Sequence, residues 1–245
     1  MILAELLVGL ALAGSDFDHD YTALDRFYGD AVSARGVDYD ALATRRAQLD
    51  EAIAAIADAP VDEFTASQQL ALYVNAYNAY TLATVLDARP LKSIMDIDGG
   101  KVWDTRKFRV AGRDLTLNQI EHGNVRRLGN GRIHAAVNCA SKGCPPLPPD
   151  PLRGSTSEAQ LDAAARTWAA TNAYRIEGGT VYLSSIFDWY ADDFPARGDI
   201  PGVDGKAEAA LWFLSDFVGA DAKARLTGGG LTAAWQSYDW SLNAR

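Results

Sequence analysis

Apolar residues recur at three- and four-residue steps through the first part of the chain, a pattern typical of amphipathic helices. The first such stretch runs over Asp20–Ala34 and is expected to stop at Gly36. A second helix is predicted over Tyr39–Ala57, before Pro60. The amino-terminal part of the chain is therefore predicted to be helical.

A third helix carries the strongest pattern in the sequence. It is expected to begin near Thr65 or Ser67, both of which can cap a helix, and to be closed by Pro90. Its apolar stripe consists of Leu70, Val74, Tyr77, Thr81 and Val85. One face of this helix should pack against the core.

Two later regions alternate polar and apolar residues around glycine-containing turns, which favours β-hairpins. The first has a strand at 107–110 and a turn at 111–113. The second has strands at 174–176 and 181–184 on either side of Gly178–Gly179. Both are expected to be small antiparallel pairs.

The segments between these hairpins complete the expected fold. Thr116 or Asn118 can cap a short helix that runs into residues 120–122, and residues 132–137 have the apolar pattern of a buried strand. A further helix is predicted over 157–170. The fold class is therefore α+β, mostly helical, with small antiparallel hairpins.

Composition fits one globular unit. The chain has 245 residues, of which 48% are hydrophobic and 22% charged, as in ordinary globular proteins. No Ser/Gly-rich linker or long charge run divides it. Residues 16–245 are predicted to form a single domain.

The formal net charge of −9 limits the partners that the chain can have. Negative charge opposes the phosphate backbone of nucleic acids and anionic membrane surfaces. Nucleic-acid binding is therefore not expected.

Residues 1–15 form an apolar run that ends in Ala11-Leu12-Ala13 before Gly14. A short apolar run followed by small residues is typical of a secretory signal and its cleavage site, and an amino-terminal apolar helix is the alternative. No second run reaches membrane-spanning length, so the mature chain is expected to have no integral membrane segment. The expected location is periplasmic or secreted.

Several motifs in one order resemble those of a known family. They are Phe17-Asp18-His19, Gly36-Val37-Asp38-Tyr39, Asn75-Ala76-Tyr77-Asn78-Ala79, Glu121-His122-Gly123, Arg132-Ile133-His134, Cys139-Ala140-Ser141-Lys142-Gly143-Cys144-Pro145 and Phe187-Asp188-Trp189-Tyr190. Together they resemble the domain of unknown function 547 family. The resemblance implies an often exported bacterial domain of mixed helices and small strands, with no activity to carry over. Gly143 departs from the pattern, which has Ser before the Cys-Pro pair.

The candidate chemistry is concentrated between Glu121 and Cys144. Cysteine catalysis needs a thiolate, a base that takes its proton and a group that orients the base. The preferred hypothesis makes Cys139 the nucleophile, His134 the base and Glu121 the orienting group. Cys144 is the substitute nucleophile, and His122 is a further candidate. The sequence thus favours a Cys/His-dependent hydrolase or acyl-transfer enzyme, peptidase-like or amidase-like.

Asn75 and Asn78 stand one helical turn apart on an otherwise apolar face. Buried amides must find partners, so these two either tie down a loop or line a polar pocket, where they would bind substrate or stabilise an oxyanion. No motif specifies the substrate, for which a peptide-like molecule is the hypothesis. No cofactor is expected.

Three alternatives stand beside the enzyme. Cys139 and Cys144 could form a disulfide, as paired thiols often do in exported proteins. With His122 and His134 they could instead form a zinc site, although a single loose Cys pair is a weak ligand set and no metal is expected. The chain could also be a non-catalytic binding or interaction domain. The aromatic residues of its carboxyl-terminal tail are interpreted as core.

Overall fold

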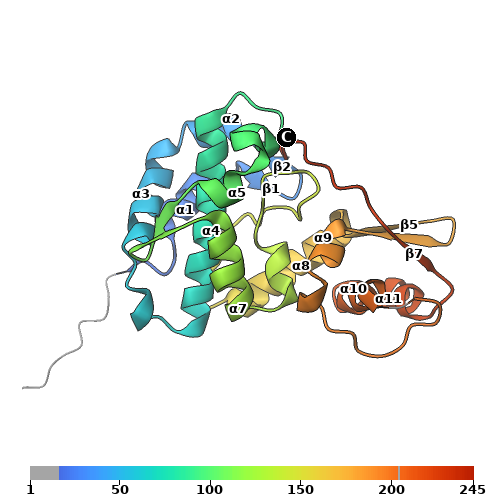
Figure 1. Ribbon diagram of the computed structural model, residues 1–245. Coiled ribbons are helices and arrows are strands. Elements are labelled where there is room, and N and C mark those ends of the chain that lie inside the picture. Colours follow the sequence, from blue (N-terminus) through green and yellow to red (C-terminus); the bar gives the residue numbers. More distant parts are fainter. Residues whose placement is uncertain (1–16, 204) are drawn as a thin grey trace, which may run out of the picture.

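The structure is a computed structural model that describes residues 17–203 and 205–245. The predicted leader, residues 1–15, lies outside this part of the chain. Helices of the amino-terminal half gather on one side of the molecule, and a smaller group of helices and strands lies on the other side (Figure 1). Within the described residues, no helix is long and apolar enough to cross a membrane.

The first predicted helix is shorter than its sequence pattern indicates. Helix α1 covers Thr22–Tyr28, and strands β1 (Val32–Ser33) and β2 (Gly36–Val37) form a hairpin where the prediction continued the helix. Gly29 ends α1 with a φ of 46°, a conformation that glycine adopts readily. The prediction of one helix over 20–34 was therefore wrong in its second half.

The second predicted helix is interrupted once. Helix α2 covers Tyr39–Ala43 and helix α3 covers Arg46–Ala57. Arg45 lies between them outside helical geometry, and its guanidinium donates to the carbonyl of Tyr28 at 3.0 Å. The break between α2 and α3 thus coincides with a contact between Arg45 and the end of α1, which local periodicity does not reveal.

Helix α4 (Ala66–Ala88) is the centre of the amino-terminal half (Figure 1). Its start is confirmed at Thr65, whose side chain accepts from Gln68 in a capping box. Residues 70–85 are all buried, so the helix is covered on every side and not along one stripe only. Helices α3 and α6 (Leu117–Ile120) are among the elements packed on it.

Short elements precede and follow α4, and those that follow it lead to the candidate site. The predicted hairpin is confirmed, with Phe108 paired to Leu115, and Thr116 caps α6 as expected. The elements are η1 (Val61–Glu63), η2 (Ile94–Gly100), α5 (Val102–Thr105), β3 (Phe108–Val110), β4 (Arg113–Leu115), the π-helical turn η3 (Glu121–Val125), α7 (Arg126–Leu128) and η4 (Gly131–Ala135).

The strand predicted at 132–137 is wrong. This segment contains the 3₁₀ helix η4, whose start is capped by the Asn130 side chain accepting from the Arg132 N–H at 3.1 Å. Its apolar residues are buried on all sides, and such a run has no period that distinguishes a strand from a short helix.

The carboxyl-terminal half contains the predicted helix and hairpin. Strands β5 and β6 pair in antiparallel register, and β7 adds to β6 in parallel, which the sequence did not predict. The elements are α8 (Ser157–Thr171), β5 (Tyr174–Glu177), β6 (Thr180–Leu183), α9 (Ser185–Trp189), η5 (Ala191–Asp193), α10 (Gly205–Ser215), α11 (Ala220–Thr227) and β7 (Thr232–Trp235).

The buried apolar residues form two clusters. One surrounds α4, and the other surrounds Trp168 of α8, whose ring stacks on Phe187 with centroids 4.6 Å apart. The described chain thus has a core in each half, and the candidate site is built from residues of both.

After β7 the tail leaves the sheet and runs back to the amino-terminal half (Figure 1). Two backbone hydrogen bonds join it to the cysteine loop. The Lys142 N–H donates to the Ser241 carbonyl (2.9 Å), and the Gly143 N–H donates to the Asp239 carbonyl (2.8 Å). The tail therefore holds the loop that carries both cysteines.

Candidate functional site

A cavity of about 310 Å³ is lined by residues from both halves of the chain. Its polar lining includes Glu121, His134, Cys139 and Cys144. The fold thus brings together four of the residues that the sequence proposed as catalytic. Six aromatic side chains also line the cavity: Tyr77, Trp103, Trp189, Tyr190, Tyr238 and Trp240.

Glu121 begins the π-helical turn η3 and is only 4% exposed. A π turn re-aims side chains within a helix and is frequent at functional sites. None of the ion pairs among the described residues includes Glu121. Its carboxyl group thus lies buried in the cavity wall, with no cationic side chain within ion-pair distance in this part of the chain.

The carboxylate affects the tyrosines that surround it. Burial raises the pKa of the Tyr77 and Tyr190 hydroxyls, and the negative charge of Glu121 raises the pKa of both further. Burial also raises the pKa of Tyr238, and the negative charge of Glu121 raises it further. These hydroxyls therefore keep their protons and remain hydrogen-bond donors at neutral pH.

His134 is oriented by Asp193 and not by Glu121. Its Nε2 lies 2.7 Å from the Asp193 Oδ2. Arg126 donates two hydrogen bonds to the same carboxylate, from Nε at 2.6 Å and from Nη2 at 2.9 Å. Burial opposes ionisation of Asp193, but the hydrogen bonds from His134 and Arg126 outweigh it and hold the pKa of that carboxyl well below its usual range. The predicted orienting role of Glu121 is therefore corrected.

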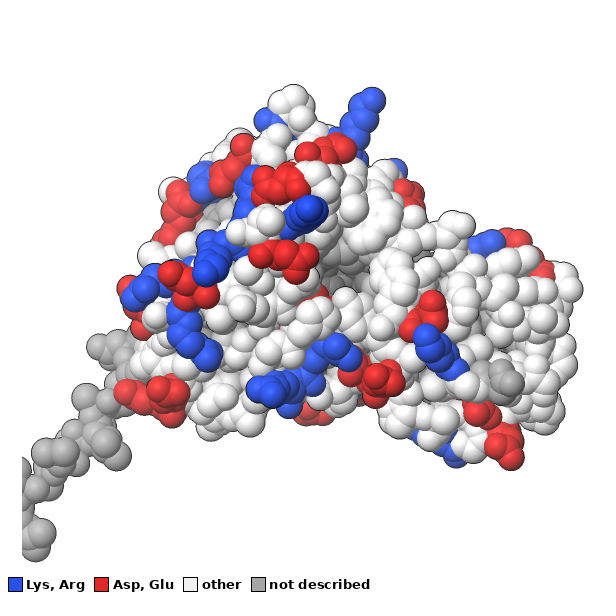
Figure 2. Space-filling model, viewed as in Figure 1, with Lys and Arg blue, Asp and Glu red and all other residues white. Residues whose placement is uncertain are grey.

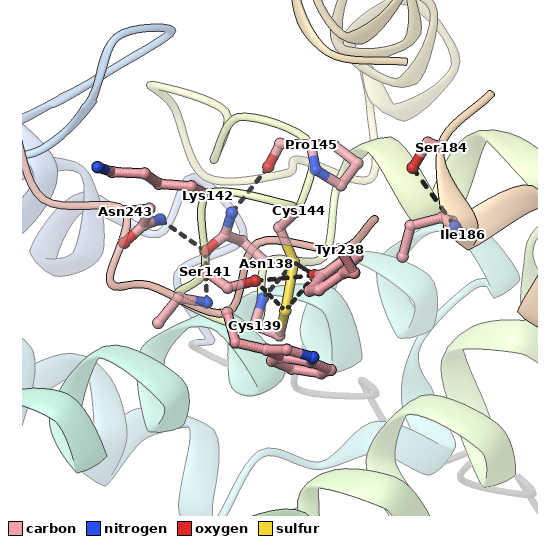
Figure 3. The surroundings of a disulfide bond; sticks show 12 residues. Asn138, Cys139, Ser141, Lys142, Cys144, Pro145, Ser184, Ile186, Tyr238 and Asn243 are labelled. Carbon is pink, nitrogen blue, oxygen red and sulfur yellow. Dashed lines mark hydrogen bonds between the residues drawn. A yellow bond between two sulfur atoms is a disulfide. The ribbon is translucent and has the colours of Figure 1, made fainter. Parts of the chain in front are cut away.

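Cys139 and Cys144 form a disulfide, the alternative that the sequence had left open. Their Cα atoms are 6.4 Å apart, within the span that a disulfide bridges. Ser141 and Tyr238 lie beside the two sulfurs (Figure 3). No hydrogen bond joins His134 to either sulfur among the described residues, so the preferred nucleophile Cys139 and the substitute Cys144 are both bonded in this state.

Asn138 organises the loop that carries the disulfide, and the sequence did not single it out. Its Oδ1 accepts from the Ala140 N–H at 2.8 Å, and its Nδ2 donates to the Pro145 carbonyl at 2.8 Å. Asn243 of the tail donates to the same Oδ1 at 3.0 Å. The loop is therefore held in shape from both ends.

Asn75 and Asn78 each donate and accept a hydrogen bond through the side-chain amide, in every case with a backbone group. Asn75 pairs with the N–H and carbonyl of Leu152 (2.9 and 2.8 Å). Asn78 accepts from the Asn138 N–H at 2.9 Å and donates to the Ala136 carbonyl at 2.8 Å. Of the two roles that the sequence allowed, the geometry gives these side chains that of tying loops to α4. They border a separate small cavity, so the substrate-binding prediction has no support at the central one.

His122 is exposed and lies outside the cavity lining. Its Nδ1 is 3.1 Å from Arg126 Nη1, and its ring stacks on Tyr190 at 6.0 Å. The imidazole thus covers the outer side of the Arg126 and Tyr190 pair.

The zinc alternative finds no ligand cluster. Among residues 17–203 and 205–245, no three His, Cys, Asp or Glu side chains are grouped as a metal site. The disulfide also occupies both thiols that this alternative required.

Sequence reasoning assigned Trp235 and Trp240 of the tail to the core, but Trp235 is exposed and Trp240 lines the cavity together with Tyr238. The rings of Tyr238 and Trp240 contact each other at 4.5 Å, and Trp189 contacts Tyr238 at 4.8 Å. Trp189 is 49% exposed, which marks it as a rim residue. No local pattern distinguishes such residues from core aromatics, because the tail reaches the cavity only through tertiary packing.

Gly143 is packed against the ring of Tyr238. A Cβ at position 143 would lie 2.9 Å from the Tyr238 ring, closer than such atoms normally approach. The absence of a side chain at Gly143 therefore lets the Tyr238 ring approach the loop, where its hydroxyl lies 3.1 Å from the Cys144 Sγ.

Acidic and basic side chains are interspersed on the face shown in Figure 2. Neither sign dominates that view. The charge that a ligand meets in the cavity is therefore set by the lining residues themselves.

Fold and site define a mostly helical α+β protein with an aromatic-lined cavity beside a disulfide. Residues 61–169 match the family described as protein of unknown function, DUF547, and the chain thus contains a domain of that family. The match includes Glu121, His134 and both cysteines, whereas Asp193 and Tyr238 lie beyond it. No curated protein and no solved structure matches the chain significantly.

Proposed function

We propose that the cavity binds a compact organic cation, an alkylated ammonium group, with Glu121 as its counter-ion. The observation that carries this proposal is the position of Glu121. It is a buried carboxylate in an aromatic wall, without an ion-pair partner among the described residues.

The carboxyl group of Glu121 and the aromatic lining of the cavity favour a cation over an anion or a neutral ligand. A buried charge is costly unless it is paired, so an incoming cation relieves the cost at Glu121. Aromatic faces add about 0.5–2 kcal/mol per well-placed contact with a cation. The nearby Asp193 and Arg126 form an ion pair with each other, so they contribute little net charge.

The proposal is tested with a pair of probes of the same shape. Choline and its neutral isostere 3,3-dimethylbutan-1-ol are titrated into the protein by calorimetry. Choline should bind at least about tenfold more tightly, and Glu121→Gln should remove most of that difference, because the variant keeps the shape and loses the charge.

Glu63→Gln is the matched control, since Glu63 is exposed and lies on η1, away from the cavity lining. It should bind choline like the original protein. Equal affinity for the two probes, or unchanged choline binding in Glu121→Gln, would overturn the proposal.

A second candidate function is the thiol-dependent hydrolase or acyl-transfer enzyme acting on a peptide-like substrate. It is favoured by one observation: Cys139 and His134 line the same cavity, and Asp193 fixes the imidazole. This activity requires reduction of the disulfide, after which Cys139 would be the nucleophile and His134 the base.

Iodoacetamide labelling of the reduced protein over a pH series tests the enzyme. If His134 activates Cys139, that thiol should label faster than Cys144, with an apparent pKa well below the roughly 8.5 of a free thiol. His134→Ala should abolish the fast phase while circular dichroism shows an intact fold. Equal, slow labelling of Cys139 in both proteins would argue against the enzyme.

We also propose that the protein is exported to the periplasm or beyond. The apolar run at residues 1–15 and the Cys139–Cys144 disulfide support this, because disulfides persist mainly in oxidising compartments. N-terminal sequencing of protein from the native host should find a start near Gly14. Recovery of a cytoplasmic product that keeps Met1 would contradict export.

A further inference from the structure

We propose that the Cys139–Cys144 disulfide is a thiol–disulfide exchange centre, which accepts two electrons from a small dithiol that enters the aromatic cavity. Both cysteines belong to the cavity lining. This inference is independent of the cation proposal, because it concerns the sulfurs and their donors and not the charge of Glu121.

The two sulfurs differ in accessibility. Cys144 is only 6% exposed, whereas Cys139 is less deeply buried. An attacking thiolate should therefore reach Cys139 first and displace Cys144 as the leaving group.

The contacts of the two sulfurs favour the same direction. The backbone N–H of Cys139 donates to the Sγ of Cys144 at 3.1 Å. The Tyr238 hydroxyl lies 3.1 Å from that Sγ and 3.0 Å from the Sγ of Cys139, so it can donate to the Cys144 thiolate as it forms. Donors aimed at a sulfur stabilise the thiolate that forms on it, and a more stable leaving thiolate departs faster. Burial raises the pKa of Tyr238, so its hydroxyl keeps the proton that it donates.

The reaction has two steps. A thiolate of the dithiol attacks the Cys139 Sγ, the protein disulfide breaks, and Cys144 leaves as a thiolate, so that a mixed disulfide joins the dithiol to Cys139. The second thiol of the dithiol then attacks its own sulfur in this mixed disulfide and releases Cys139. The dithiol is oxidised to a disulfide, and its two protons complete the two protein thiols.

The loop has contacts that would keep it in place after reduction. The Lys142 and Gly143 N–H groups donate to the tail, and Asn138 donates to the Pro145 carbonyl. These bonds do not depend on the link between the sulfurs. The native loop can therefore present two thiols as well as a disulfide.

The test is the rate at which dithiothreitol reduces the folded protein, followed by quenching and thiol counting. Tyr238→Phe keeps the ring that packs on Gly143 and removes only the hydroxyl. It should slow reduction roughly tenfold, since a hydrogen bond to a developing charge is lost. Tyr190→Phe is the matched control, because it removes a hydroxyl from the same cavity lining and no hydrogen bond among the described residues joins Tyr190 to either sulfur, so the rate should fall much less.

The order of attack is tested separately. With an aromatic disulfide reagent, the single thiol of Cys144→Ser should form a mixed disulfide at Cys139 faster than the single thiol of Cys139→Ser forms one at Cys144. Melting temperatures of both single-cysteine variants verify that they fold. A disulfide that dithiothreitol reduces only when the chain unfolds, or equal rates in the original protein and Tyr238→Phe, would overturn the inference and leave a structural disulfide.

Discussion

Replacing Trp168 with alanine should lower the free energy of unfolding by about 3–5 kcal/mol, the range for deleting a fully buried large aromatic side chain. Trp168 is 0% exposed and stacks on Phe187 with an interplanar angle of 12°. Its indole N–H has no hydrogen-bond partner among the described residues, so the loss comes from packing and hydrophobic burial. Urea unfolding at neutral pH measures it.

Trp189→Ala is the matched control, because Trp189 is 49% exposed at the rim of the cavity. It should change the free energy of unfolding by less than about 1 kcal/mol. Similar losses in both variants would show that the cluster around Trp168 is not a core. That cluster includes Phe194, which follows Asp193, so its packing also supports the position of the carboxylate beside His134.

Replacing Asp193 with asparagine should destabilise the protein by about 2 kcal/mol at pH 6, because two charge-assisted hydrogen bonds to Arg126 lose their anion. This figure lies below that for a fully buried pair, since the Asp193 side chain is 19% exposed. Urea unfolding of the variant and the original protein gives the difference directly.

The loss should depend on pH in a defined direction. Because the pKa of Asp193 is depressed in the folded protein, its stabilising contribution is present above the unfolded pKa of roughly 3.9 and is lost as pH falls through the lower folded pKa. The two proteins should therefore converge in stability only below about pH 4. Asp192→Asn, at the exposed neighbouring position, should show neither effect. A difference that stays constant down to pH 2.5 would contradict the role assigned to Asp193.

Local sequence determined the elements whose signals are themselves local. The central helix α4 begins at Thr65 as its capping residues predict, and both glycine-turn hairpins form where the alternation places them. The sequence also located the cavity, since Glu121, His134 and the two cysteines line it together. These residues lie within one short segment, so backbone connectivity alone keeps them near one another.

Tertiary structure decided which partners these residues have. Asp193 meets His134 from 59 positions away, and Tyr238 reaches Cys144 from 94 positions away. Periodicity and capping report only on neighbours within a few turns of chain, so they carry no information about such contacts. The wrong strand prediction at 132–137 has a related cause. When a short run is buried on every side, its apolar pattern is the same for a strand and for a helix. The sequence by itself determined the central helix, the two glycine-turn hairpins and the place of the site. Packing across the two halves decided the orienting carboxylate, the aromatic wall and the donors around the disulfide.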